Sequence, residues 1–558
     1  MSSVAPLAPA ASHATHEVLN QPSTLDGLNL YTSHTALVEA TRREGADWVE
    51  ERAGALGVLA GGEATRWGFE ANENPPKLHT HDRYGHRIDE VEFHPAWHEL
   101  MGMAVASELH SLPWTETRPG AHAARAAMYM TAAQAEAGFG CPITMTFAAV
   151  PALRAQPELA AEWEPRLTAT TYEPRLMPGA QKGSALCGMA MTEKQGGSDV
   201  RANTTTARAL NGGGPGAEYE LTGHKWFCSA PMCDLFLVLA QAPEGLSCFA
   251  VPRVLGDGSR NPFALQRLKD KLGNRSNASS EVEFRGTWGR MVGEPGRGVP
   301  TIIEMVGHTR LDCVIGTAAG MRAGVVQATH HAAQRSAFGR RLIDQPLMRN
   351  VLADLSLESE AATALAMRLA RAYDEAPGDE SAQRFKRLAT AVGKYWVCKR
   401  GPGHAFEALE CLGGNGYVES SGMPRLYREM PLSSIWEGSG NVMSLDVLRA
   451  LSRSPATLED FFAEVALAAG ANAHLDHHLD ALRAEFADPH ELEARARRVV
   501  EAMGLALQGS LLVRHAPAAV ADAFCASRLG SEGGLAYGTL PAGCDFDAIL
   551  ARHRPELE

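Results

Sequence analysis

The sequence predicts an α+β fold, mainly α, with four domains in the order helical, β, helical and helical. The chain has 558 residues, of which 45% are hydrophobic, so it is too long for one compact domain and can bury several cores. Apolar residues recur at helical spacing in the first third and again in the second half, and short β-rich runs lie between these regions. We place the domains at residues 1–183, 184–298, 299–453 and 454–558.

The first domain is predicted to be mostly helical. Alanine-rich segments with apolar residues three and four apart run from about residue 30 to residue 177. The polar segment His79–His86 interrupts them, and we interpret it as an irregular loop. Its histidines have no cysteine nearby, so the sequence does not favour a metal site, and we predict none in the chain. Residues 1–18 are expected to form a mobile tail.

The second domain is predicted to be a compact antiparallel barrel or sandwich. Short runs such as EYELTGHKWFCSA, DLFLVLA and SSEVEFRG are separated by Gly, Asn, Asp and Pro. No long helical segment separates them, which argues against parallel strands joined by helices.

Helical periodicity resumes with one long helix predicted over residues 299–335. It contains four small residues that permit close packing of a neighbouring helix. They are Gly316, Ala319, Gly320 and Ala323. A second helix is predicted to begin at Pro346, because proline is favoured at the first helical position. The region after Pro455 is also predicted to be helical, and its 451–558 segment holds nine arginines, no lysine and sixteen acidic residues.

Charge and cysteine content limit the class of protein. The net charge of −13 argues against a uniformly positive surface for nucleic acid, so only a local basic patch could bind it. The ten cysteines form no C-x-x-C pair, which favours neither a zinc site nor a secreted disulfide framework. We therefore expect a cytoplasmic protein. No apolar run is long enough to cross a membrane, so we expect no membrane partner.

One carboxylate stands out in SSIWEGSGNVM, where Glu437 lies between an aromatic residue and a run of small residues. Two interpretations are open. Glu437 could be a solvated residue at the edge of a Gly-Ser loop. It could also be a general base, since a carboxylate held partly out of water has a raised pKa and can take the α-proton of an acyl thioester.

Two further segments have polar or aromatic residues that could suit a flavin, and a third looks like half of a dinucleotide fingerprint. Gly196-Gly197-Ser198 could turn backbone N–H groups and a hydroxyl toward a phosphate or a flavin ring, although such a loop is often only a turn. TGHKWFCSAP, residues 222–231, offers an aromatic beside a hydroxyl, or only core packing. GGNGYV, residues 413–418, follows a helical run and not a strand, so it does not indicate a Rossmann fold.

Taken in order, these segments resemble the acyl-CoA dehydrogenase family. MTEKQGGSD and GHKWFCS resemble its two flavin motifs, AQRSAFGRRLIDQP resembles its Arg-x-x-Phe-Gly segment, and LGGNGY with IWEGSGN resembles its closing motifs. NQP, FHPAWH, CPITMTFAA and RLKDKLGNRSNAS, together with the extra C-terminal helical domain, are similar to the alkylation-response branch of that family. The resemblance implies a helical N-terminal domain, a central β domain, a four-helix bundle and the added helical domain.

The resemblance also implies a homotetramer, a dimer of dimers, with one FAD in each subunit. The implied FAD contacts form two groups, of which the second comes from a neighbouring subunit. The first group comprises Met191, Thr192, Gly197, Ser198, Phe227, Cys228, Ser229, Trp436, Gly438, Ser439 and Asn441, and the second comprises Arg335, Phe338, Gly413 and Gly414.

Glu437 matches the catalytic base of the family. It would take an α-proton while the β-hydrogen leaves as hydride to the flavin, and its backbone N–H would help to polarise the thioester carbonyl. The alternative base position of the family holds Thr309, which cannot serve. The chain also departs from the family pattern at Lys194-Gln195, at Trp436 and at Gly307, which replaces an aspartate that contacts acyl-CoA.

Two functions follow from the resemblance. The first is a flavoprotein that binds duplex DNA and protects it from alkylation or repairs it, with weak dehydrogenase activity on a small, isovaleryl-like acyl-CoA. The alternative is an ordinary short branched-chain acyl-CoA dehydrogenase without a DNA role. Arg495 and Arg498 are the DNA-binding candidates because they share a helix face, although they could instead pair with Glu491 and Glu493.

Overall fold

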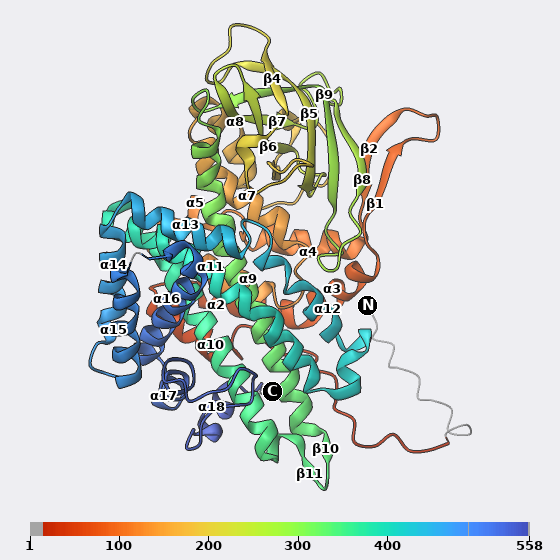
Figure 1. Ribbon diagram of the computed structural model, residues 1–558. Coiled ribbons are helices and arrows are strands. Elements are labelled where there is room, and N and C mark those ends of the chain that lie inside the picture. The colour runs from red at the N-terminus through yellow and green to blue at the C-terminus, as the bar shows by residue number, and fades with distance from the viewer. Residues whose placement is uncertain (1–14, 489, 556–558) are drawn as a thin grey trace.

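The computed structural model describes residues 15–488 and 490–555, and Figure 1 shows their arrangement. The larger part of the predicted N-terminal tail, residues 1–14, lies outside the described residues. The fold is α+β and mainly helical, as the sequence predicts: a β-barrel stands at one end of a large helical body.

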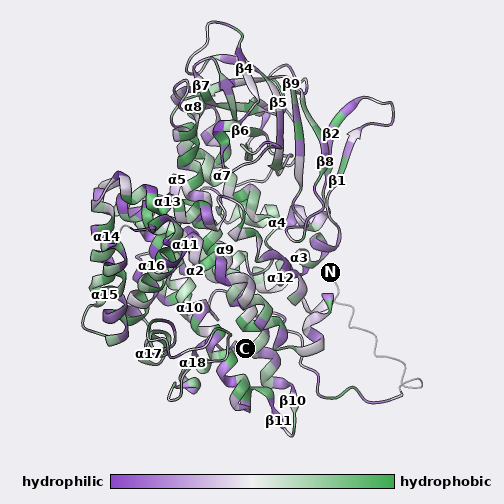
Figure 2. Cartoon of the chain, viewed as in Figure 1, coloured by the Kyte–Doolittle hydropathy of each residue, from purple (hydrophilic) through white to green (hydrophobic). Residues whose placement is uncertain are grey.

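The N-terminal region is helical and packs under the barrel. Its helices are α1 (Thr35–Arg43), α2 (Glu50–Leu59), α3 (Thr65–Glu73), α4 (Pro95–Ala106), α5 (Leu112–Thr115), α6 (Ala121–Ala132), α7 (Gly140–Leu153) and α8 (Pro157–Leu167). Figure 2 shows α7 as an almost continuously hydrophobic helix, and every residue in it except Pro151 is buried. A helix that is apolar all round must be covered on all sides, and α7 packs against both the barrel and the long helix α9 (Gly298–Gln334).

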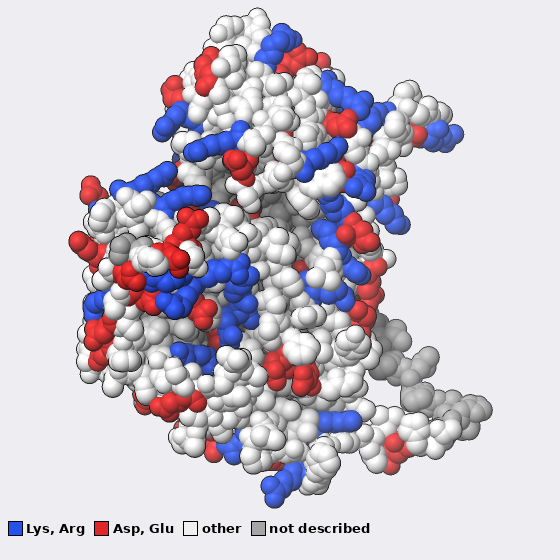
Figure 3. Space-filling view, viewed as in Figure 1, with Lys and Arg blue, Asp and Glu red and all other residues white. Residues whose placement is uncertain are grey.

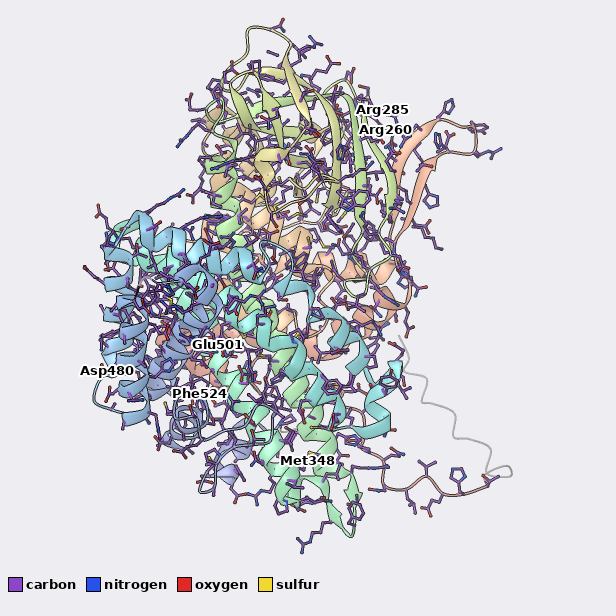
Figure 4. All side chains as sticks on the ribbon, in the orientation of Figure 1. Arg260, Arg285, Met348, Asp480, Glu501 and Phe524 are labelled. Atoms are coloured by element: carbon purple, nitrogen blue, oxygen red, sulfur yellow. The ribbon has the colours of Figure 1, made fainter. Side chains whose placement is uncertain are left out.

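The prediction of an irregular loop at His79–His86 is wrong. This segment belongs to an antiparallel hairpin of β1 (Lys77–His81) and β2 (Arg87–Glu92), whose turn is closed by the Asp82 side chain. Exposed strands with polar residues on both faces give no hydrophobic alternation, so the sequence pattern does not reveal them. The hairpin projects beside the barrel, and its Glu90 pairs there with Arg260, labelled in Figure 4.

The central domain is a closed barrel. Its strands are β3 (Cys187–Ala190), β4 (Thr206–Ala209), β5 (Glu218–Ser229), β6 (Leu235–Ala242), β7 (Gly245–Pro252), β8 (Phe263–Leu268) and β9 (Ser279–Val292). The order β6-β4-β5-β9-β7 closes because β7 also pairs with β6. Most pairs are antiparallel, as expected, but β3 and β4 pair in parallel with β6. The β4–β5 hairpin, and not a helix, connects these parallel strands, so helical periodicity gives no sign of them.

Long helices form the body of the molecule below the barrel. The helix predicted over residues 299–335 is α9, which has 37 residues, and the helix predicted to begin at Pro346 is α10 (Pro346–Glu375). They pack against each other and against α11 (Glu380–Glu410), which in turn contacts α13 (Gly440–Arg453). The short helix α12 (Met423–Glu429) and the two-residue strands β10 (Ser336–Ala337) and β11 (Arg340–Arg341) complete this region.

The C-terminal region packs on α10 and α11. Its helices are α14 (Ala456–Val465), α15 (Ala473–Ala487), α16 (Leu492–His515), α17 (Ala518–Phe524) and α18 (Phe546–His553). Buried charges fasten it to α10. Arg528 pairs with Asp354 and lies 3.3 Å from the Glu358 carboxylate, and Arg552 pairs with Glu360.

We expect Arg528→Met to lower the free energy of unfolding by about 3–5 kcal/mol, because removing one partner of a buried pair leaves the other charge uncompensated. The matched control is Arg483→Met, whose guanidinium pairs with the exposed Asp480 carboxylate (Figure 4) and should contribute less than about 1 kcal/mol. Urea denaturation followed by circular dichroism measures both. Equal losses in the two variants would contradict a fastening role for Arg528.

Candidate active site

The backbone at Glu437 is in a left-handed conformation, with φ of 60° at Glu437 and 109° at Gly438. Such a conformation costs a residue with a side chain ~1–3 kcal/mol and persists only where the surroundings hold it. Two cations hold it here. Arg310 Nε on α9 donates to the Glu437 carbonyl oxygen at 3.0 Å, and Lys394 Nζ on α11 donates to the Gly438 carbonyl oxygen.

The Glu437 carboxylate contacts a hydroxyl and no cation. Thr309 Oγ1 donates to Glu437 Oε2 at 2.7 Å, so the two positions that the resemblance marks as alternative places for the base are in direct contact. Among the described residues, Glu437 forms no ion pair, since Arg310 is paired with Asp446 at 2.8 Å. Burial raises the pKa of Glu437, and the Thr309 hydrogen bond and the charges of Arg310 and Lys394 oppose the rise.

Sequence reasoning missed Arg310 and Lys394. Lys394 is a single charge in the apolar run ATAVGKYWVC, and a lone lysine in such a run is a usable signal because lysine is rarely buried without a partner. Arg310 adjoins Thr309 in the chain but gives no separate signal. Gly307, which replaces the expected aspartate, accepts a hydrogen bond from Tyr373 through its carbonyl oxygen at 2.7 Å.

A cavity of about 200 Å³ lies beside Glu437. One face of α9 forms a long wall of it. The α9 residues in that wall are Thr309, Asp312, Cys313, Gly316, Thr317, Gly320, Ala323, Val326 and Gln327. Their spacing of three and four residues places them in one stripe. The cavity therefore follows the axis of α9.

Four carboxylates line this cavity, and two of them are neutralised by arginines. Asp312 forms a two-pronged pair with Arg125 at 2.7 Å, and Glu136 pairs with Arg425 at 3.1 Å. The third is Glu429, whose two oxygens accept from the backbone N–H of Asn274 at 2.7 and 2.8 Å. Burial raises the pKa of Glu429 to about 7. Glu437 is the fourth, and it directly precedes the Gly438-Ser439-Gly440 segment.

A buried ion pair shapes the first predicted flavin motif. Glu193 and Lys225 pair at 2.9 Å, and both side chains are fully buried. The Glu193 carboxylate also accepts from the backbone N–H groups of Thr204 and Thr205, which fixes the loop on β5. Gly197 then lies so close to Thr192 that an added Cβ would be 2.5 Å from its hydroxyl. A side chain at Gly197 would displace Thr192.

The residues predicted to face the flavin ring are only partly covered. Ser198 is exposed, Thr192 and Ser229 are partly accessible, and Phe227 is 55% exposed although it is aromatic. The pairing of β5 with β9 is interrupted between Lys225 and Cys228, which frees this stretch from the sheet. An exposed aromatic beside hydroxyls and free backbone fits the flat face and polar edge of a flavin.

Cys228 and Met191 differ from their neighbours. The Cys228 side chain is buried in the barrel, and its carbonyl oxygen accepts from Ser280 Oγ, so its side chain does not face the expected flavin. The Met191 carbonyl oxygen accepts from the Asn203 side chain at 2.9 Å. The indole N–H of Trp436, in contrast, is buried without a hydrogen-bond partner among the described residues, as a site for a polar ligand would leave it.

Ser439, Gly440 and Asn441 form the start of α13. Ser439 is its N-cap and makes no side-chain capping bond, and Asn441 accepts from Arg497 Nε of α16 at 2.8 Å. Gly440 lies next to the side chains of Lys399 and Arg497, both exposed. A helix N-terminus beside two cations is suited to a phosphate group. These residues fit the phosphate end of a nucleotide cofactor.

Four of the predicted FAD contacts lie apart from the remaining predicted FAD contacts in the single chain. They are Arg335, Phe338, Gly413 and Gly414. Arg335 follows the last residue of α9, so it lies ~39 Å from Thr309 along the helix at ~1.5 Å per residue. Phe338, in the turn between β10 and β11, is 99% exposed. Gly413 and Gly414 are also exposed. This group is separate from the Glu437 cavity in the single chain.

The two predicted DNA-binding arginines lie on α16 and both pair with Glu485 of α15, and not with Glu491 or Glu493. Arg495 is 18% exposed and also donates to the carbonyl oxygens of Asp488 and His490. Arg498 is 66% exposed. On the face of the molecule that Figure 3 shows, lysine and arginine side chains gather over α11 and α16.

The described part of the chain contains neither a metal-binding cluster nor a membrane-crossing helix. No three His, Cys, Asp or Glu side chains come together there in a way that would hold a metal ion. None of its helices combines the length and the hydropathy that a bilayer crossing requires.

Comparison with known families covers most of the chain. Residues 20–174 match the family described as adaptive response protein AidB, N-terminal domain. Residues 188–287 match the acyl-CoA dehydrogenase middle domain, and residues 296–452 match the acyl-CoA dehydrogenase C-terminal domain.

Individual relatives agree with these matches. AidB from Escherichia coli strain K12 is 47% identical over 93% of this chain and 96% of its own length. Acyl-CoA dehydrogenase family member 11 from Caenorhabditis elegans is 30% identical over 70% of this chain and 64% of its own length.

Solved structures share the fold. The apo form of Bd2924 has a TM-score of 0.82 at 27% identity and covers 89% of this chain and 99% of its own. An acyl-CoA dehydrogenase complexed with FAD from Bacillus anthracis has a TM-score of 0.63 at 15% identity and covers 94% of this chain and 87% of its own. The matched domains, together with the extended identity to AidB, place this chain in the AidB branch of the FAD-dependent acyl-CoA dehydrogenase family.

Proposed function

We propose that the protein removes an α-proton and a β-hydride from an acyl-CoA, with Glu437 as the base. One observation carries the proposal: the Glu437 carboxylate lines a cavity, is bonded to a hydroxyl and has no cationic partner among the described residues. A carboxylate paired with arginine would be a poor base, because the pair stabilises its ionised form. Here the cations bind the carbonyl oxygens of Glu437 and Gly438, and the carboxylate remains free to accept a proton.

The residues around Glu437 have distinct roles in this reaction. Bound FAD supplies the hydride acceptor. Thr309 orients the carboxylate, and burial gives Glu437 a raised pKa that suits proton abstraction. Arg310 and Lys394 fix the left-handed backbone that points the side chain into the cavity. An isovaleryl group is small enough to lie beside Glu437, and we propose weak activity on it.

Glu437→Gln should keep FAD and the fold but reduce flavin reduction by an acyl-CoA at least ~10²-fold, because the amide cannot accept the proton. Wild-type reduction should rise with pH, since the base must be ionised and its pKa is raised. Thr309→Val should move that rise to higher pH, because the Thr309 hydrogen bond lowers the pKa. Anaerobic single-turnover absorbance across pH measures all three. A Gln variant as fast as the wild type would end the claim that Glu437 is the base.

We also propose a homotetramer, a dimer of dimers, in which FAD bridges subunits. The support is the ~39 Å that separates Arg335 from Thr309 along α9, which keeps one chain from placing both at one cofactor. The exposed Phe338 is an apolar surface that a neighbouring subunit and its cofactor would cover. FAD binding and assembly are therefore coupled.

Arg335→Ala should lose FAD and tetramer together, because a guanidinium meeting a pyrophosphate across the subunit boundary stabilises both. Arg341→Ala is the control: it lies on the same hairpin and pairs with Asp344 at 2.8 Å. The FAD-to-protein absorbance ratio and light scattering report the two properties. Full FAD content in the Arg335 variant would place the pyrophosphate contact elsewhere.

A second proposed function is the binding of duplex DNA, with protection from alkylation damage as its purpose. The observation that favours it is the exposed basic group of Lys399, Arg497 and Arg498: Lys399 and Arg497 both lie next to Gly440, and Arg498 follows Arg497 on α16. Figure 3 shows basic side chains gathered over α11 and α16. Arg495 contributes less, because Glu485 and nearby carbonyl oxygens already engage its guanidinium. Over the whole chain acidic residues exceed basic ones, with a net charge of −13, so we confine the proposed contact to this basic group.

Binding should be largely independent of DNA sequence and should weaken steeply with salt, since phosphate contacts release counterions. Arg498→Ala should reduce the salt slope by about one, whereas Arg495→Ala should leave it nearly unchanged. Fluorescence anisotropy with a labelled duplex at several salt concentrations measures the slope. Equal slopes for the wild type and the Arg498 variant would move the site, and no binding at low salt would remove this function.

We propose the cytoplasm as the location of the protein. All ten cysteines are free, and nine of them are buried. Unpaired thiols at this frequency suit a reducing compartment.

A further inference from the structure

A lysine without a carboxylate partner lies in the loop between β8 and β9. Lys271 is half-buried and forms no ion pair with the described residues; its ammonium donates to the Asn277 carbonyl oxygen at 2.7 Å and to Ser279 Oγ at 3.0 Å. Lys182 and Lys225 are also buried, and each of them pairs with a carboxylate. Burial lowers the pKa of Lys271 to about 8, so the group stays charged at neutral pH. Its unpaired charge is therefore available to another group.

A chain of two hydroxyls leads away from Lys271. Ser279 Oγ lies 3.3 Å from Ser229 Oγ on the neighbouring strand β5. An ammonium has three donors and no acceptor, so Ser279 accepts from Lys271 and keeps its own proton for Ser229. When Ser229 accepts that proton, its own proton points away from Ser279. The charge of Lys271 thus gives the hydroxyl chain one direction, from the loop outward.

The outer end of this chain lies beside the cavity that holds Glu437. Ser229 is partly accessible, and its other neighbour is the thiol of Cys141, which lines that cavity. Burial raises the pKa of Cys141 to about 12, and the Ser229 hydroxyl opposes the rise. Sulfur is a weak acceptor. Among the described residues the Ser229 proton has no strong acceptor, so it is available to a ligand.

Asn277 provides a second, independent sign of a missing polar partner. Its side chain is 1% exposed, and neither the oxygen nor the nitrogen of its amide has a hydrogen-bond partner among the described residues. Buried amides are nearly always satisfied in folded proteins, so an unpaired one marks a place where water or a ligand completes the structure. Lys271, Asn277, Ser279 and Ser229 therefore form a polar cluster that is incomplete without a further group.

We infer that Lys271 is a positioning residue for the flavin: through Ser279 it directs the Ser229 hydroxyl toward the ring, and its charge favours the reduced cofactor. This rests on the FAD-dependent function proposed above, in which Ser229 contacts the flavin. Reduction adds electrons to the ring, and the reduced ring is an anion near neutral pH. A nearby cation and the positive end of an O–H dipole both stabilise added negative charge. Lys271 has no ion-pair partner that would cancel this effect.

Lys271→Met should lower the two-electron midpoint potential of bound FAD by at least ~30 mV, which is a ten-fold loss of preference for the reduced form. Ser279→Ala keeps the cation but cuts the chain, so it should lower the potential by less. The double variant should shift the potential by less than the sum, because both changes act through one chain. Reductive titration of each holoenzyme with dithionite beside a dye of known potential measures all of these without an acyl-CoA.

Lys269→Met is the matched control. Lys269 lies two residues earlier and pairs with Glu281 at 2.7 Å, and that carboxylate keeps Arg267 as a second partner. Neither hydroxyl of the chain bonds to Lys269. Its removal takes one positive charge from the same segment but leaves the chain intact, so the potential should move much less than in Lys271→Met.

The outcomes separate this inference from the proposed dehydrogenation. Equal potentials in the wild type and Lys271→Met would overturn the inference, and so would an equal shift in Lys269→Met. If Lys271→Met fails to fold or to hold FAD, Ser279→Ala decides, because an unchanged potential there would also overturn it. An unchanged potential in Ser229→Ala would overturn the inference and remove Ser229 from the flavin contacts. A wild type that holds FAD but is reduced by no acyl-CoA would refute the dehydrogenation alone.

Discussion

The site depends on two cations that bind carbonyl oxygens and leave a carboxylate unpaired. Arg310 and Lys394 hold the backbone of Glu437 and Gly438 in a left-handed turn, and the turn directs the Glu437 side chain into the cavity. If either cation reached the carboxylate instead, the pKa of Glu437 would fall, which would make the group less suited to the proposed role of base. The partners of Arg310 explain why it does not: Asp446 takes one end of the guanidinium and the Glu437 carbonyl takes the other.

The long helix α9 links the parts of the active site. It carries Thr309 beside Glu437 and Gly316 in the wall of the cavity, and the chain continues from its last turn into Arg335. A helix of 37 residues fixes the distances between these positions, because its rise per residue is constant. The same rigidity that holds Thr309 beside Glu437 keeps Arg335 ~39 Å away along the helix. In the proposed homotetramer, subunit assembly and cofactor binding would therefore be coupled.

Charge is distributed differently inside the cavity and on the surface. In the cavity, Asp312 and Glu136 are paired with arginines, whereas Glu429 accepts from a backbone N–H and Glu437 from a hydroxyl. On the surface, Glu485 holds Arg495 and Arg498, although Arg498 remains exposed. The C-terminal region thus combines a buried fastening to α10 through Arg528 with an outer face available to a charged partner.

The sequence by itself determined the class of fold, the extent of α9, the start of α10 at Pro346 and the family. These features follow from local patterns: helical periodicity, proline position and ordered motifs. It also singled out Glu437, while the role of that residue stays a prediction. Only the tertiary structure decided that Arg310 and Lys394 hold the turn, that Gly316 faces a cavity whereas Gly320 and Gly324 pack, and that His79–His86 belongs to a hairpin. The physical reason is that these outcomes depend on contacts between segments distant in the chain, and the local pattern around a glycine or an arginine is the same whichever neighbour it meets.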